Sequence, residues 1–186
     1  MLRVDTRCIE MDLTWNMSIW HQFGAAIDML ENALQACPDE LWQERLFNDR
    51  SAPPEFAEFW YIAYHALFWL DFYLSDSAEG FAPPAPFTLS ELDADLLPER
   101  VYTKAELITY LEYGRSKCQA RLETLTDALL PQQCRPDWPD MSVAELLFDN
   151  MRHVQEHTAQ LNLFLGQKMG LASRWVSKTQ SKSSGT

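Results

Sequence analysis

The segment from Pro54 to Leu74 constrains the fold most, because it is apolar on almost every side. A helix of this kind must be covered on several faces by other parts of the chain. Pro53 and Pro54 suit the start of such a helix, since the first turn does not need the N–H that proline lacks. We therefore predict that residues 54–74 form the most enclosed helix of an all-α fold.

Three further helices follow from periodicity and stop signals. Residues 14–36 carry apolar residues seven apart, the stripe of a helix packed in a bundle, and Pro38 ends this helix. Thr103 with Glu106 and Ser142 with Glu145 form capping boxes, which start helices over residues 103–130 and 142–166. The stripe in the first helix consists of Leu13, Trp20, Ile27 and Leu34. No strand periodicity stands out, so we predict a four-helix bundle.

The stretch from 75 to 100 contains Gly80 and four prolines, and it predicts a long crossover between helices two and three. A short helical turn is expected near Leu89 to Leu97. Long irregular connections act as lids or as plain crossovers, and the plain crossover is the favoured interpretation. We expect one domain over residues 1–176 and a polar, disordered tail over residues 177–186.

The charge balance argues against several classes of partner. The net charge is −12, with 15 basic residues scattered among 27 acidic ones. Neutralised phosphates dominate nucleic-acid affinity, so neither DNA nor RNA is expected as a partner, and an anionic membrane surface is disfavoured too. The longest apolar stretch is interrupted by Glu58, His65 and Asp71, so no membrane span is predicted. The four cysteines form no CxxC pair and the start of the chain lacks an apolar signal run, which favours the cytoplasm.

His153 and His157 are the strongest candidates for chemistry. Residues four apart on a helix point in nearly the same direction and can hold one metal ion. Both histidines flank the apolar stripe centred on Val154, so they face inward or nearly so. The residue after His153 is Val154, so the zinc-protease pattern HExxH is absent.

His65 lies in the middle of the second predicted helix. A lone buried histidine is more often neutral and hydrogen-bonded to a carbonyl. A metal ion shared with His153 and His157 would also give the buried imidazole of His65 the partner that it needs. Three histidines leave a coordination position open, as catalytic sites do. Zinc or nickel suits such a site best, with iron or manganese as alternatives. A di-iron site would need Glu three residues before a histidine, and that pattern is absent here.

Several neighbouring residues are candidates for supporting roles. Asn150 is three residues before His153 and Gln160 is three after His157, so either could orient an imidazole or a bound ligand, although ordinary hydrogen bonding is the favoured interpretation for each. His21, beside the apolar stripe of the first helix, is expected not to be a ligand. The aromatic residues of 54–74 are most simply core, and could also wall an apolar substrate pocket.

The order of these elements resembles the DinB-like metalloproteins. The resemblance covers roughly residues 14–176: a central histidine on helix two, YTKAELITYLEYGRSKCQARLETL around helix three, HVQEHTAQLN on helix four, and the later WVSK. It implies a four-helix bundle with a long crossover and a divalent metal ion held by His65, His153 and His157. It also implies similarity in fold to S-transferases that use mycothiol, bacillithiol or glutathione.

Two function hypotheses follow from these features. The first is a metal-dependent enzyme that activates a small thiol for attack on an electrophilic substrate, or water for hydrolysis. The second is a non-catalytic, stress-related bundle that binds a metal or a ligand. Exposed apolar stripes would also allow a homodimer. An open path from solvent to the histidines favours the enzyme, and a closed four-ligand site favours the second hypothesis.

Overall fold

A computed structural model describes residues 6–48, 53–93, 96–135, 138–171 and 173–179, with backbone only at residues 6–14, 135, 138 and 139. Four α-helices account for most of this part of the chain: α1 (Thr6–Ala36), α2 (Phe59–Tyr73), α3 (Lys104–Glu123) and α4 (Val143–Met169). Three short 3₁₀ helices and one two-stranded hairpin join them. The predicted all-α bundle is confirmed.

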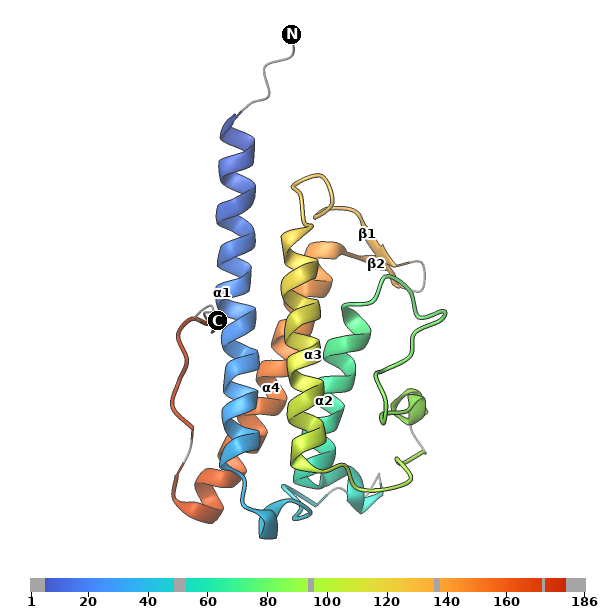
Figure 1. The fold of residues 1–186 in the computed structure, drawn as a ribbon, viewed down its shortest axis with the longest axis vertical. Coiled ribbons are helices and arrows are strands. Elements are labelled where there is room, and N and C mark those ends of the chain that lie inside the picture. The colour runs from blue at the N-terminus through green and yellow to red at the C-terminus, as the bar shows by residue number, and fades with distance from the viewer. Residues whose placement is uncertain (1–5, 49–52, 94–95, 136–137, 172, 180–186) are drawn as a thin grey trace, which may run out of the picture.

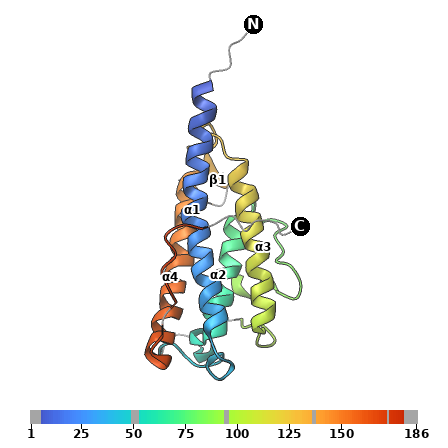
Figure 2. The ribbon, with the colours of Figure 1, turned by 60° about the vertical axis from the view of Figure 1, so that its left-hand side comes forward.

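The four helices form a ring in the order α1, α3, α2, α4, in which α2 and α1 each pack against both α3 and α4 (Figure 1). The first turns of α1 project beyond the end of the bundle, as the turned view in Figure 2 also shows. Two of the stripe residues predicted for this helix, Ile27 and Leu34, are fully buried, whereas Trp20 is half-buried. The side chain of Leu13 lies outside the described residues. None of the helices in the described part of the chain is both long and apolar enough to cross a membrane.

Helix α2 is the most enclosed helix, as predicted, with Tyr64 and Phe68 among its fully buried residues. It begins at Phe59 and not at Pro54, because Pro54–Ala57 form a 3₁₀ turn and Glu58 is extended. The N–H groups of Phe59 and Trp60 donate to the carbonyls of Glu44 and Trp42, both at 3.0 Å. Contacts with the preceding loop therefore set the start of α2.

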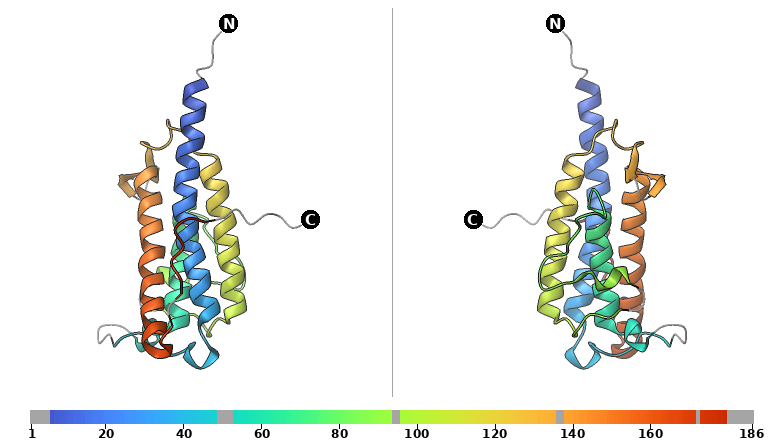
Figure 3. Two further views of the ribbon diagram at one scale, coloured as in Figure 1. Left: turned by 90° about the vertical axis from the view of Figure 1, so that its left-hand side faces the viewer. Right: turned by 90° about the vertical axis from the view of Figure 1, so that its right-hand side faces the viewer.

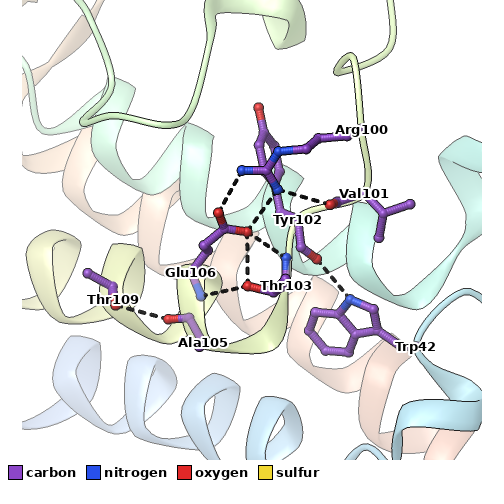
Figure 4. Close-up of polar contacts among 8 residues, drawn as sticks. All are labelled: Trp42, Arg100, Val101, Tyr102, Thr103, Ala105, Glu106 and Thr109. Atoms are coloured by element: carbon purple, nitrogen blue, oxygen red, sulfur yellow. Dashed lines mark hydrogen bonds and ion pairs between the residues drawn. The ribbon is translucent and has the colours of Figure 1, made fainter.

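Helix α3 starts with the predicted capping box, which Figure 4 shows in detail. The Thr103 hydroxyl accepts from the N–H of Glu106 at 3.3 Å, and the Glu106 carboxylate accepts from the N–H of Thr103 at 2.8 Å. Arg100 adds a bond to the same carboxylate at 2.6 Å. This network joins the end of the crossover to the first turn of α3.

Helix α3 ends at Glu123, and the prediction that it runs to Leu130 is wrong. The Thr124 hydroxyl donates to the Arg121 carbonyl at 2.8 Å, a local bond that competes with a further helical turn. The following residues form a hairpin that the sequence did not predict: β1 (Gln133–Arg135) pairs antiparallel with β2 (Trp138–Ser142). Strands this short carry too little periodicity to be recognised.

Helix α4 begins with the predicted Ser142–Glu145 capping box and extends three residues past the predicted end at Gly166. Its end is set by Gly170, which has φ +70° and donates its N–H to the Gly166 carbonyl at 3.0 Å. A left-handed residue after the last turn is the conformation that glycine adopts most easily.

The crossover between α2 and α3 runs along the outer side of α2 (Figure 1). It contains one 3₁₀ turn, η3 (Leu89–Leu92), close to the predicted position. The Tyr64 hydroxyl donates to the Thr88 carbonyl at 3.2 Å, and this bond helps to hold the turn on α2.

The chain beyond α4 turns back along α1, as the left view of Figure 3 shows. Thr179 is only 2% exposed and donates its N–H to the His21 carbonyl at 3.0 Å. A Cβ on Gly24 would come within 2.5 Å of the Thr179 side chain, so this glycine allows the close approach. Residues 177–179 of the predicted tail therefore lie on α1, and residues 180–186 are outside the described residues.

Candidate metal centre

The three predicted histidines come from two neighbouring helices. His65 lies in the middle of α2, whereas His153 and His157 are one turn apart on α4. Because α2 packs against α4, the single histidine faces the pair. The structure thus brings together residues that are 88 positions apart in the chain.

The Nε2 atoms of the three imidazoles converge on one point. The Nε2 of His153 lies 3.1 Å from the Nε2 of His65 and 3.1 Å from that of His157. The ligand atoms of the group all lie within 4.8 Å of one another. Two imidazole nitrogens on a tetrahedral zinc ion at about 2.05 Å would be about 3.3 Å apart. The spacing therefore suits one ion shared by all three residues.

Hydrogen bonds at the other ring nitrogen orient two of these imidazoles. The Nδ1–H of His65 donates to the carboxylate of Glu91, and the Nδ1–H of His157 donates to Oε1 of Gln160 at 2.9 Å. In a neutral imidazole that donates from Nδ1, Nε2 carries a lone pair. Such outer partners are typical of metal-binding histidines. The chemistry of this donor set fits a divalent ion.

His153 differs from the other two, because its Nδ1 is buried without a hydrogen-bond partner among the described residues. Burial lowers the pKa of His153 to about 3, with smaller contributions from the nearby His157 and His65. Burial, followed by the His65 charge, also lowers the pKa of His157. Both imidazoles are therefore neutral near pH 7, which is the form that binds a metal ion.

The group is partly exposed to solvent. All three histidines are half-buried, and 27% of the His65 side chain is exposed. Aromatic rings border the site: the ring of Trp69 is 6.2 Å from that of His65, and the ring of Tyr73 is 6.0 Å from that of His153. Some of the aromatic residues of α2 therefore flank the site, while others form the core.

Glu91 is the residue at this site that the sequence analysis missed. It lies on η3 in the crossover, where it accepts hydrogen bonds from His65 and, at 2.8 Å, from the Tyr61 hydroxyl. The favoured interpretation of this segment as a plain crossover is therefore too simple, because the crossover adds a carboxylate to the site. A helical turn carrying an acidic residue was visible in the sequence, but no spacing rule linked it to His65.

The two predicted supporting residues lie in different places. Gln160 contacts His157, as described above. Asn150 is fully buried and donates to the Leu70 carbonyl at 3.1 Å, so its amide nitrogen fastens α4 to α2 and does not orient an imidazole. His21 lies outside the three-histidine group, in a pocket of about 350 Å³ between α1 and α3.

The fold and the site define an all-α bundle with a three-histidine group that could hold a metal ion. In the comparison with family models, the model of the DinB superfamily matches residues 22–161. The match extends from α1 into α4 and includes all three histidines, and the chain belongs to this superfamily. Comparisons with curated proteins and with solved structures gave no match.

Proposed function

We propose that this protein is a metal-dependent enzyme in which His65, His153 and His157 hold a divalent ion. The convergence of three imidazoles at a partly exposed point carries this proposal, and burial keeps the His153 imidazole neutral by lowering its pKa. Zinc or nickel suits imidazole ligands best, with iron or manganese as alternatives. When bound, the ion would supply the positive charge that lowers the pKa of a small thiol or of water beside it.

The residues of the chain itself have three tasks in this proposal. The three imidazoles bind the ion and leave at least one side for a small molecule. Glu91 and Gln160 accept the Nδ1–H groups of His65 and His157, which keeps both Nε2 lone pairs directed at the ion. Trp69 and Tyr73 border the site with apolar surface, which suits the apolar part of a substrate.

A low-molecular-weight thiol is the first candidate for the small molecule. Two cysteines of the chain are poor nucleophiles, since burial raises the pKa of Cys37 to about 12 and raises that of Cys118 as well. A thiol supplied from solution would therefore form a C–S bond with the electrophile, while its S–H proton passes to water and the displaced group leaves with the electron pair of the broken bond. Hydrolysis by an activated water is the second reaction that the same site would support.

The same proposal includes the domain organisation, the cellular location and the kind of substrate of the protein. A single domain over residues 1–176, acting in the cytoplasm on small molecules, agrees with the strongly acidic composition and with cysteines that form no CxxC pair. A non-catalytic metal- or ligand-binding bundle is the alternative function, and a site closed by a fourth protein ligand would favour it.

Titration of the cobalt-loaded protein with glutathione tests this function. We expect a new thiolate-to-cobalt absorption band, whereas the metal-free protein should show none. If glutathione leaves the spectrum unchanged but azide alters it, the open position exists and the hydrolytic reaction is favoured. If neither molecule alters the spectrum, the ion has no exchangeable position and the enzyme proposal is wrong.

A further inference from the structure

The crossover places a carboxylate against α2 at the side of the histidine group. Glu91 lies on η3, and only 5% of its side chain is exposed. Its two side-chain partners, His65 and Tyr61, both belong to α2 and lie one turn apart. The crossover therefore places a nearly buried carboxylate next to the Nδ1 atom of His65, one of the candidate metal ligands.

Among the described residues, the Glu91 carboxylate has no lysine or arginine partner. Its ion-pair geometry involves His65 alone, and its other bond comes from the Tyr61 hydroxyl. Burying a carboxylate is costly unless charge and hydrogen bonds compensate it. A cation on the opposite nitrogen of His65 would provide that compensation across a single imidazole ring.

We propose that Glu91 is a positioning residue for the metal ion and that Tyr61 holds Glu91 in place. In this arrangement the Nδ1–H of His65 donates to Glu91, so Nε2 points its lone pair at the ion. The positive charge of the ion balances the carboxylate, and the crossover thereby becomes part of the metal centre. This inference rests on the function proposed above.

A simpler role for Glu91 would be to fasten the crossover to α2. The two roles differ in what they predict for metal affinity. A fastening residue affects the stability of the metal-free protein, whereas a positioning residue affects binding of the ion even where stability is preserved. Glu91→Gln separates them, because glutamine keeps the size and the hydrogen-bonding oxygen but removes the charge.

Zinc calorimetry on the full chain, purified free of metal, tests the proposal. We expect Glu91→Gln to bind zinc about 10–100-fold more weakly than the wild type. Loss of a hydrogen-bond partner of a metal-binding histidine lowers metal affinity by about this factor in other proteins. The matched control is Glu79→Gln, which removes an exposed carboxylate from the same crossover and should bind zinc like the wild type. Tyr61→Phe should weaken binding about fivefold, the equivalent of one ordinary hydrogen bond. In the Glu91→Gln background it should add nothing.

Nitrogen NMR of the metal-free protein measures the hydrogen bond on which the positioning role depends. His65 should carry its proton on Nδ1 in the wild type, and Glu91→Gln should reduce that preference. If Glu91→Gln does not fold, Tyr61→Phe still decides, since unchanged zinc affinity in that variant would contradict the proposal.

The outcomes are distinguishable from failure of the proposed function. Zinc binding by the wild type with equal affinity in Glu91→Gln would overturn the role of Glu91 and leave the metal site standing. A lower melting temperature in Glu91→Gln with unchanged zinc affinity would show a fastening residue only. If the wild type binds none of zinc, nickel, iron and manganese, both proposals are wrong together.

Discussion

At the scale of single residues, the buried carboxylate of Asp71 has specific partners. Asp71 is fully buried on α2, where it accepts a hydrogen bond from the Tyr110 hydroxyl at 3.0 Å. It also accepts one from the ammonium group of Lys117, which in addition donates to the Ser75 hydroxyl at 2.7 Å. Charged hydrogen bonds of this kind contribute more to stability than neutral ones. Asp71 therefore ties α2 to α3 in the interior.

Replacing Asp71 with asparagine should lower the free energy of unfolding by about 2 kcal/mol, because the bond to the Lys117 cation is lost in a buried setting. Urea denaturation measures this change. The control is Asp76→Asn, which removes the ion pair between Arg121 and the Asp76 carboxylate. Because 84% of the Asp76 side chain is exposed, this substitution should change the free energy of unfolding by less than about 0.5 kcal/mol. Equal effects of the two substitutions would contradict the account.

The candidate site could be predicted only in part from such residues. His153 and His157 share a helix, so their spacing alone predicts a joint site, and the enclosure of α2 brings in His65. Glu91 depends on where a proline-rich crossover folds back, which no local rule determines. The spacing of Asn150 left two roles open, and its side chain makes an ordinary hydrogen bond to the backbone of the neighbouring helix.

At the scale of elements, capping determines where α3 and α4 begin. In both helices a hydroxyl and a glutamate satisfy each other's backbone N–H groups, so the sequence pattern was sufficient. The ends were harder to predict. Helix α3 stops where the Thr124 hydroxyl bonds to the preceding turn, and the hairpin after it is held by bonds such as Val143 N–H to the Gln132 carbonyl at 2.9 Å.

The cap of α3 should make stability depend on pH. Hydrogen bonds from Arg100, followed by the Thr103 N–H, lower the pKa of Glu106 from 4.5 to about 2. A carboxyl whose pKa is lowered on folding stabilises the protein fully above about pH 4.5, and this contribution is lost as the pH falls towards 2. The network in Figure 4 is therefore weakened in acid.

Glu106→Gln should cost about 1 kcal/mol of stability at pH 6, the usual contribution of a helix cap. The difference from the wild type should become smaller at pH 3, because the wild type also loses part of its carboxylate contribution there. Urea denaturation of both proteins at pH 6 and pH 3 measures this difference in the free energy of unfolding. A difference that is the same at pH 6 and pH 3 would argue against the role of the carboxylate charge.

At the scale of the whole molecule, the order of the helices explains the site. The crossover lets α2 and α4 lie side by side, although α3 separates them in the chain. Their contact creates the three-histidine group, and the crossover itself adds Glu91 over α2. The bundle could be predicted from helix periodicity, but this ring order and the path of the crossover depend on contacts between distant segments. Family membership agrees with the arrangement, because the matched region contains both histidine-bearing helices.

The most direct test of the account is the metal content of the full chain purified without chelator, measured by mass spectrometry beside that of His153→Ala. His153 is the best choice, since its Nε2 lies 3.1 Å from the Nε2 of both other histidines. His21→Ala is the matched control, because His21 lies outside the group. The account predicts about one divalent ion per chain in the wild type and in His21→Ala, and loss of most of it in His153→Ala. A wild type without stoichiometric metal, or a His153→Ala variant that retains all of it, would contradict the central claim.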